Sequence, residues 1–158
     1  MVATSVFPVP GSMPPRLLVV DDDAEIVKLI GISMRSRGFL VDGATTLTEA
    51  IAAIEATTYS VVLTDKNLKG ATGLELIDAL SLKAPTTAIV LMTAYPEGAL
   101  GRLASLDGYV GKPFKSLDLV AQALQDAMER RQRTIERQKM AGKLGEVQTA
   151  LSPSTVRR

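Results

Sequence analysis

The chain lacks cysteine and histidine altogether, and it has no tryptophan. Without cysteine there is no disulfide framework and no thiolate metal site, and without histidine there is no imidazole base or metal ligand. No apolar run approaches the roughly 20 residues that a membrane-spanning helix needs. Residues 1–15 contain four prolines and no lysine or arginine, so they do not resemble a secretory signal and are interpreted as a flexible lead. Together these absences predict a cytoplasmic protein without a membrane partner.

Charge is distributed unevenly along the 158 residues, a length typical of about one domain. Residues 1–128 carry 10 lysines and arginines against 14 acidic residues, whereas residues 129–158 carry 8 against 3. The body is therefore mildly acidic and the tail is basic. The basic residues between Arg130 and Lys143 could contact nucleic-acid phosphates, but no aromatic residues lie between them for base stacking. We interpret this stretch as a solvated, charged helix and expect no nucleic-acid partner.

Apolar runs alternate with stretches of helical periodicity along the body, and this order predicts a doubly wound α/β fold with a five-stranded parallel sheet. Because the strand runs are almost wholly apolar, both faces of the sheet should be buried. Asp23 is expected to cap the first helix, and Thr46 with Glu49 has capping-box spacing. The expected strands are 16–20, 39–43, 60–64, 88–92 and 108–111, and the expected helices are 24–37, 47–56, 73–81, 97–105 and a last one from residue 116.

Polar residues stand at the carboxyl ends of four of these strands. Asp21 and Asp22 follow the first run, Asp65 the third, Thr93 the fourth and Lys112 the fifth. In open α/β sheets, ligands bind at that edge. Carboxylates, a hydroxyl and an ammonium group can together hold a divalent cation and a phosphoryl group. Because the chain has no histidine, any phosphoryl group must come from a partner or a small donor.

Four segments at these strand ends together resemble the signature of response-regulator receiver domains. They are Leu18-Val19-Val20-Asp21-Asp22-Asp23, Leu63-Thr64-Asp65, Met92-Thr93-Ala94 and Gly111-Lys112-Pro113-Phe114. The resemblance covers residues 16–129 and implies a flavodoxin-like (βα)5 fold. It implies that Asp65 is the phosphoacceptor and that Thr93 and Lys112 contact the phosphoryl group. The implied ligands of Mg²⁺ or Mn²⁺ are Asp21, Asp22, Asp65 and the backbone carbonyl of Asn67.

The same resemblance implies roles for residues around this set. Tyr109 matches the aromatic switch residue, whose ring moves inward when the switch hydroxyl engages the phosphoryl group. The Lys112–Pro113 peptide bond is expected to be cis, as in the family. Asn67 and Tyr95 occupy positions that influence hydrolysis of the aspartyl phosphate.

Two features depart from the family pattern. Lys69 stands where receivers usually have a proline, so the loop after Asp65 is expected to differ slightly. Thr93 and Lys112 are 19 positions apart, about three fewer than the family pattern leads us to expect. We therefore predict a fourth helix that is shorter by roughly one turn.

Residues 130–158 are predicted to form a basic helical extension that ends in a disordered segment from Ser152. Gly142 and Gly145 should weaken the helix. Apolar residues resume there at spacings of four, three and four: Met140, Leu144, Val147 and Leu151. They indicate either a short amphipathic helix, through which the chain could form a homodimer, or a solvated helix end.

The resulting prediction is a phosphoacceptor response regulator and not an enzyme. Its partners would be a sensor histidine kinase or phosphotransfer protein and a downstream protein. The alternatives are a receiver-fold scaffold that acts by protein contacts without phosphorylation, and a receiver fragment of a longer regulator. A hydrolase with a nucleophilic aspartate is disfavoured, because Asn67 stands where such an enzyme has its second acid.

Tyr95 generates a kinetic prediction, because a bulky ring two residues after Thr93 should hinder the water that hydrolyses the aspartyl phosphate. We expect Tyr95→Ala to lose the phosphoryl group faster than the wild type. Decay of the phosphorylated protein, followed by intact mass, measures the rate, and equal decay rates would refute the role of Tyr95.

Overall fold

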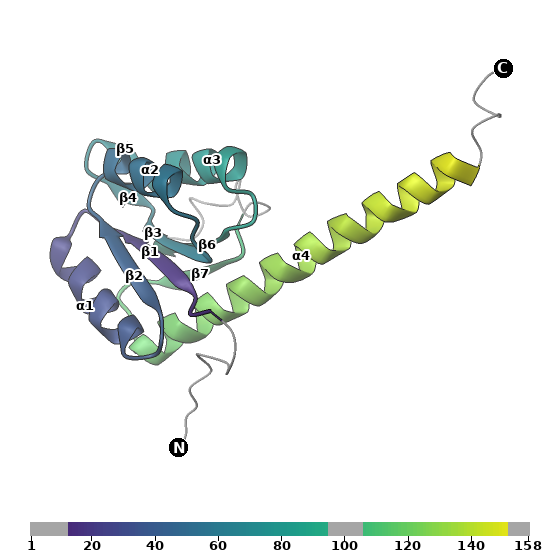
Figure 1. Cartoon of the computed structure of the whole chain (residues 1–158). Helices are drawn as coiled ribbons and strands as arrows, with labels where there is room; N and C mark the ends of the chain where they lie inside the picture. Colours follow the sequence, from purple (N-terminus) through teal and green to yellow (C-terminus); the bar gives the residue numbers. More distant parts are fainter. Residues whose placement is uncertain (1–12, 95–105, 152–158) are drawn as a thin grey trace.

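A five-stranded parallel sheet forms the centre of the molecule, in the order β2-β1-β3-β6-β7 (Figure 1). The computed structural model describes residues 13–94 and 106–151, with side chains as far as Leu144. The predicted doubly wound, five-stranded fold is confirmed. The strands of the sheet are β1 (Arg16–Val20), β2 (Leu40–Ala44), β3 (Val61–Asp65), β6 (Ala88–Thr93) and β7 (Gly108–Gly111).

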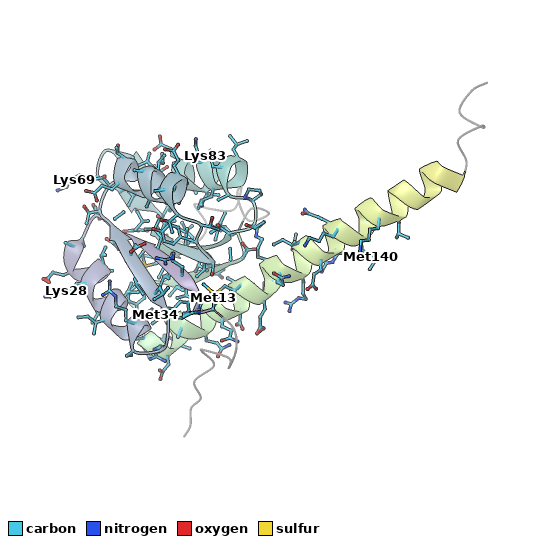
Figure 2. The ribbon with its side chains drawn as sticks, viewed as in Figure 1. Met13, Lys28, Met34, Lys69, Lys83 and Met140 are labelled. Carbon is cyan, nitrogen blue, oxygen red and sulfur yellow. The ribbon has the colours of Figure 1, made fainter. Side chains whose placement is uncertain are left out.

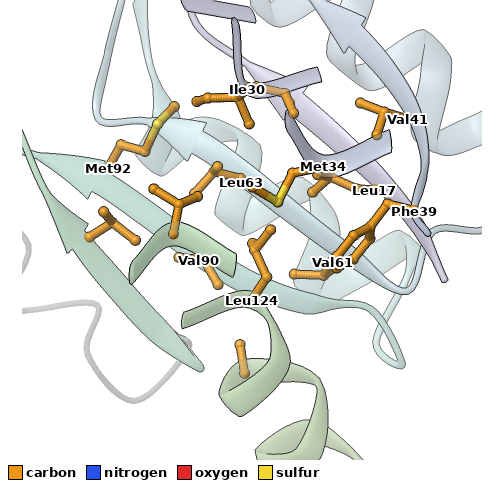
Figure 3. Packing of buried hydrophobic residues seen from close by; sticks show 14 of the residues in the cluster. Leu17, Ile30, Met34, Phe39, Val41, Val61, Leu63, Val90, Met92 and Leu124 are labelled. Atoms are coloured by element: carbon orange, nitrogen blue, oxygen red, sulfur yellow. The ribbon is translucent and has the colours of Figure 1, made fainter. Parts of the chain in front are cut away.

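Each inner strand buries side chains on both faces of the sheet, because alternate residues point to opposite sides. Leu17 and Val19 of β1 pack into one apolar cluster, whereas Leu18 and Val20 pack into the other. The side chains of β3 and β6 are distributed between the two clusters in the same alternating way. In the first cluster, most of which Figure 3 shows, side chains from all five strands of the sheet meet Ile30, Met34 and Leu124.

Four helices lie in the described part of the chain and cover the two faces in pairs (Figure 1). Their bounds are α1 (Ala24–Arg35), α2 (Leu47–Ala56), α3 (Gly73–Lys83) and α4 (Leu117–Leu151). Helices α1 and α4 cover the face that carries Leu17, and α2 and α3 cover the face that carries Leu18. The ring of Tyr59 closes the second face near its edge, and its hydroxyl donates to Asp42 at 2.7 Å.

The helix caps agree with the sequence prediction, except that one capping hydrogen bond is displaced by one residue. Asp23 caps α1 as predicted, since its carboxylate accepts from the backbone N–H of Glu25 at 2.9 Å. At α2 the Thr46 hydroxyl accepts from the N–H of Glu49 at 3.1 Å. The reciprocal bond of the predicted capping box is displaced, because the Glu49 carboxylate accepts from the N–H of Thr45, one residue before the cap.

Several element boundaries and one loop differ from the sequence prediction. Helix α1 ends at Arg35, two residues early, because the chain turns through Gly38 with a φ of 101°. The expected loop after Asp65 contains a small antiparallel hairpin, β4 (Asn67–Leu68) and β5 (Ala71–Thr72). The predicted short helix at 97–105 lies outside the described residues.

Helix α4 extends well beyond the sheet (Figure 1). Its first turns bury Val120, Leu124 and Ala127, whereas Met140 and Leu144 are 59% and 58% exposed (Figure 2). The helix runs unbroken through Gly142, although we expected the glycines to weaken it. A glycine costs only about 1 kcal/mol relative to alanine, and its neighbours favour helix. In the described residues, no helix combines the length and apolar character needed to cross a membrane.

The division of α4 into a packed and a projecting part predicts different costs for the same substitution. Leu124→Ala removes a fully buried side chain and should lower the free energy of unfolding by about 2–5 kcal/mol. Leu144→Ala, on the exposed part, should change it by less than about 0.5 kcal/mol. Urea unfolding followed by circular dichroism measures both, and equal effects would contradict this division of the helix.

Candidate functional site

The carboxyl ends of four neighbouring strands bring the predicted site residues to one edge of the sheet. Asp21 directly follows β1, Asp65 ends β3, Thr93 ends β6, and Lys112 directly follows β7. Because β1, β3, β6 and β7 are neighbours in that order, Asp65 stands between the acidic residues on one side and Thr93 on the other. Parallel pairing therefore gathers residues that are as far as 91 positions apart in sequence.

Three carboxylates form a cluster at this edge. Asp21, Asp22 and Asp65 each offer an oxygen atom, and these atoms lie within 4.8 Å of one another. Asp21 is buried and accepts a hydrogen bond from the backbone N–H of Asp23 at 2.8 Å. Asp22 is exposed, so one side of the cluster is open to solvent. The cluster thus combines fixed oxygen ligands with an access path.

Lys112 supplies the positive charge that this cluster needs. Its Nζ atom lies 2.8 Å from Oδ2 of Asp21 and 3.0 Å from Oδ2 of Asp65. Burial alone would lower the pKa of Lys112. The hydrogen bonds and charges of Asp21 and Asp65 outweigh burial, so the pKa is raised above its ordinary value. The ammonium group therefore stays charged at neutral pH and bridges two carboxylates. The Lys112–Pro113 peptide bond is cis.

The β4–β5 hairpin fixes the carboxylate of Asp65 from the other side. The backbone N–H of Asn67, the first residue of β4, donates to Oδ1 of Asp65 at 3.2 Å. The hairpin turns at Lys69 and Gly70, where Gly70 has a φ of 72° that suits glycine. Asn67 pairs with Thr72, so the hairpin holds the Asn67 backbone beside the acidic cluster.

Helix α3 begins directly against the end of β3, the strand that carries Asp65. The N–H of Gly73 donates to the carbonyl of Lys66 at 2.7 Å, and a Cβ atom on Gly73 would lie 2.1 Å from the carbonyl oxygen of Asp65. Thr72 and Glu75 form a full capping box that fixes this start. Only glycine fits here, because any larger residue would collide with the backbone of Asp65.

Thr93 and Tyr109 lie on the neighbouring strands. Thr93 is buried, and its carbonyl accepts from the N–H of Lys112 at 3.1 Å, which joins the ends of β6 and β7. Tyr109 is 54% exposed on β7. Its ring borders a groove of about 270 Å³ that Phe114 and Leu119 also line. Tyr95 lies outside the described residues.

The donor set suits a hard divalent cation. The three carboxylates offer only oxygen, and the exposed Asp22 leaves one side open for water. Mg²⁺ and Mn²⁺ favour oxygen ligands, whereas the described residues offer no sulfur or imidazole here for softer metals. The residues at this edge therefore fit Mg²⁺ or Mn²⁺.

Sequence reasoning missed the parts that support this cluster. Gly73 and the Thr72–Glu75 capping box hold the loop after Asp65, yet our prediction began a helix at 73 without a cap. The Thr-x-x-Glu spacing was a readable signal for the cap. The role of Gly73 was not readable, because it depends on how closely the helix approaches the carbonyl of Asp65.

An acidic cluster and a lysine at the carboxyl edge of a doubly wound five-stranded sheet define the class of signal receiver domains. The family model for the response regulator receiver domain matches residues 17–124. The chain therefore belongs to the response regulator receiver domain family.

Individual relatives agree with this assignment. The photosynthetic apparatus regulatory protein RegA of Rhodovulum sulfidophilum is 35% identical over 115 residues, which cover 70% of this chain and 62% of the relative. The DNA-binding response regulator MtrA of Mycobacterium tuberculosis is 34% identical over 117 residues, covering 70% of this chain and 49% of the relative. The chain thus matches about half to three-fifths of the length of these relatives.

A solved structure shows the same architecture. The receiver domain of the Francisella response regulator 1452 superposes with a TM-score of 0.66 at 27% sequence identity. The match covers 73% of this chain and 98% of that domain. The shared part is therefore a complete receiver domain.

The close approach of α3 to Asp65 predicts the effect of Gly73→Ala. The added methyl group must push the start of α3 away from the Asp65 carbonyl, at a cost of about 1–3 kcal/mol in unfolding free energy. It should also weaken Mg²⁺ binding, because the Asn67 backbone moves with the loop. Chemical denaturation and Mg²⁺ titration test both effects.

Gly142→Ala is the matched control, since nothing lies within 4 Å of its added Cβ atom. This variant should be neutral or slightly more stable, because alanine favours helix. Wild-type stability and Mg²⁺ affinity in Gly73→Ala would show that the loop does not depend on this contact.

Proposed function

We propose that this chain is the phosphoacceptor part of a two-component response regulator that works in the cytoplasm. Asp65 would accept a phosphoryl group from a sensor histidine kinase or a phosphotransfer protein, with Mg²⁺ or Mn²⁺ bound beside it. One observation carries the proposal: the ammonium of Lys112 contacts Asp65 at 3.0 Å within a cluster of three carboxylates. Such a cluster concentrates the charges that a transferring phosphoryl group requires.

Asp65 is favoured over its neighbours as the acceptor by its position. It ends the central strand β3, between Asp21 on β1 and Thr93 on β6. The side chain of Asp21 is 1% exposed, against 12% for the side chain of Asp65, so a phosphoryl donor would reach Asp65 more easily. Asp22 is exposed and has no lysine contact described. A phosphoryl group on Asp65 would therefore have carboxylates on one side, and a hydroxyl and an ammonium group on the other.

The transfer itself needs a nucleophile and groups that hold the phosphoryl oxygens. An oxygen of the Asp65 carboxylate would attack phosphorus, the bond between phosphorus and the donor's histidine nitrogen would break, and that histidine would keep the electron pair. Lys112 would bind one phosphoryl oxygen, and the hydroxyl of Thr93 would donate to another. A bound divalent cation would neutralise charge that develops on the phosphoryl oxygens.

The rest of the chain would carry the signal onward. We propose that residues 16–129 form the receiver unit, that residues 130–158 form a basic extension, and that Tyr109 and Thr93 act as the switch pair. The downstream partner would be a protein that contacts the receiver surface or the extension, with a homodimer through α4 as the alternative. The 54% exposure of Tyr109 matches the outward state from which the proposed switch would move inward.

Beryllofluoride with Mg²⁺, and acetyl phosphate with Mg²⁺, test the proposed function directly. We expect the wild type to gain the mass of one phosphoryl group with acetyl phosphate and to unfold at a higher temperature with beryllofluoride and Mg²⁺. Asp65→Asn should lose both responses, because it removes the nucleophile while keeping the size of the side chain. Asp118→Asn, an exposed substitution that only breaks an ion pair with Arg37, should keep both.

Two results would count against the proposal. A mass gain that survives in Asp65→Asn would place the acceptor at another residue. A wild type that responds to neither reagent, although folded, would instead favour a receiver scaffold that acts by protein contacts alone.

A further inference from the structure

Asp107 lies at the end of the sheet opposite to Asp65, and it forms hydrogen bonds with Ile89, Arg130 and Arg131. It directly precedes β7, and it is only 9% exposed. Its backbone N–H donates to the carbonyl of Ile89 at 2.8 Å, and its carboxylate accepts from the N–H of Ile89 at 2.8 Å. Asp107 therefore joins the beginnings of β6 and β7 through both its backbone and its side chain.

The same residue holds helix α4 at the place where the helix leaves the domain. Arg131 donates to Oδ2 of Asp107 from Nε at 3.1 Å and from Nη2 at 2.8 Å. Arg130 donates to the carbonyl of Asp107 at 2.9 Å. A longer bond of 3.4 Å joins Arg131 to the carbonyl of Pro85. Two consecutive arginines of α4 thus donate hydrogen bonds to one buried acidic residue, Arg131 to its carboxylate and Arg130 to its backbone carbonyl.

Near this contact, the side chains of α4 change from partly buried to mostly exposed. The helix buries Leu124 and Ala127 one to two turns before Arg131, and Arg133 and most side chains after it are exposed. Arg131 itself is only 19% exposed, so its charge is largely withdrawn from water. Buried charge pairs hold a defined geometry better than exposed pairs do, because neither charge can be solvated when they separate. Among the side chains of α4 that the structure describes, Arg130 and Arg131 are therefore the last to hydrogen-bond to Asp107 at the start of β7.

We propose that Asp107 and Arg131 form an anchor that makes the projecting part of α4 one rigid body with strands β6 and β7. These two strands carry Thr93 and Lys112 at their opposite ends, so the anchor connects the strands of the candidate site to the helix. A displacement of β6 or β7 would then change the direction of the whole helix. The link to signalling rests on the proposed function, but the anchor itself is a property of the protein without metal or phosphoryl group.

Spin labels can measure this attachment, and the absence of native cysteine makes the labelling specific. The exposed residues Ala52 on α2 and Lys143 on α4 are replaced by cysteine and labelled. Double electron–electron resonance then gives the distribution of distances between the domain and the helix. Without Mg²⁺ or phosphoryl donor, we expect a single narrow distribution in the labelled, otherwise wild-type chain.

Arg131→Gln should lose the narrow distribution, because the helix is then free to pivot at its exit from the domain. Arg133→Gln, two residues further along the exposed helix, is the matched control and should keep it. Asp107→Asn removes the charge from the other side of the contact and should broaden the distribution in the same way. If Asp107→Asn fails to fold, Arg131→Gln still decides the question, since Arg131 contributes nothing to the apolar core.

A narrow, unchanged distribution in Arg131→Gln would overturn the anchor. A broad distribution in the unsubstituted labelled chain would overturn it as well, because no rigid attachment would then exist. Neither result depends on whether Asp65 is phosphorylated, so failure of the anchor is distinguishable from failure of the proposed function.

Discussion

Burial of the inner strands on both faces is the constraint on which the rest of this structure depends. Strands β1, β3 and β6 are covered by α1 and α4 on one side and by α2 and α3 on the other. Polar side chains are costly along such strands, so almost all of them stand at the ends. Because the strands are parallel, all their carboxyl ends lie along one side of the sheet and all their amino ends along the other. The carboxyl side carries Asp21, Asp65, Thr93 and Lys112. The site is thus a consequence of the way in which the core is built.

The crowding of acids at that edge creates an electrostatic imbalance. Three carboxylates lie together, and the ammonium group of Lys112 is the cation described in contact with them. Like charges at this separation repel strongly in a partly buried place. Lys112 offsets part of the repulsion by contacting Asp21 and Asp65 at once. The remaining negative charge would favour the binding of a divalent cation at this edge, and it would make the position of Lys112 sensitive to any group that binds Asp65.

Sequence patterns were sufficient for the sheet and for the placement of the site residues, because both follow from apolar runs and from the residues that end them. The run Leu17 to Val20 predicted β1 to the residue, and Asp23 was correctly predicted as a cap. Patterns could not predict the β4–β5 hairpin or the close packing of Gly73 on Asp65. Two-residue strands leave no periodicity, and the need for a missing Cβ atom at Gly73 arises only from how closely the start of α3 packs on the end of β3 in three dimensions. The anchor was hidden for the same reason, since Asp107 and Arg131 are 24 residues apart and each resembles an ordinary surface charge.

The projecting part of α4 shows how a helix can persist without a core to cover. Glutamine and acidic residues four positions apart are bonded along α4, and one of these bonds, 3.2 Å from Gln132 to Glu136, lies in its projecting part. Such pairs contribute only about 0.2–0.5 kcal/mol each, and in proteins most helical stability comes from packing of an amphipathic face. Continuity with the packed turns around Leu124 removes the cost of nucleation, because the helix only has to propagate. Attachment through Arg131 then determines where the helix points, whereas local propensity determines only that it forms. With α4 anchored as proposed, a change at this one buried contact would redirect the helix without altering the helix itself.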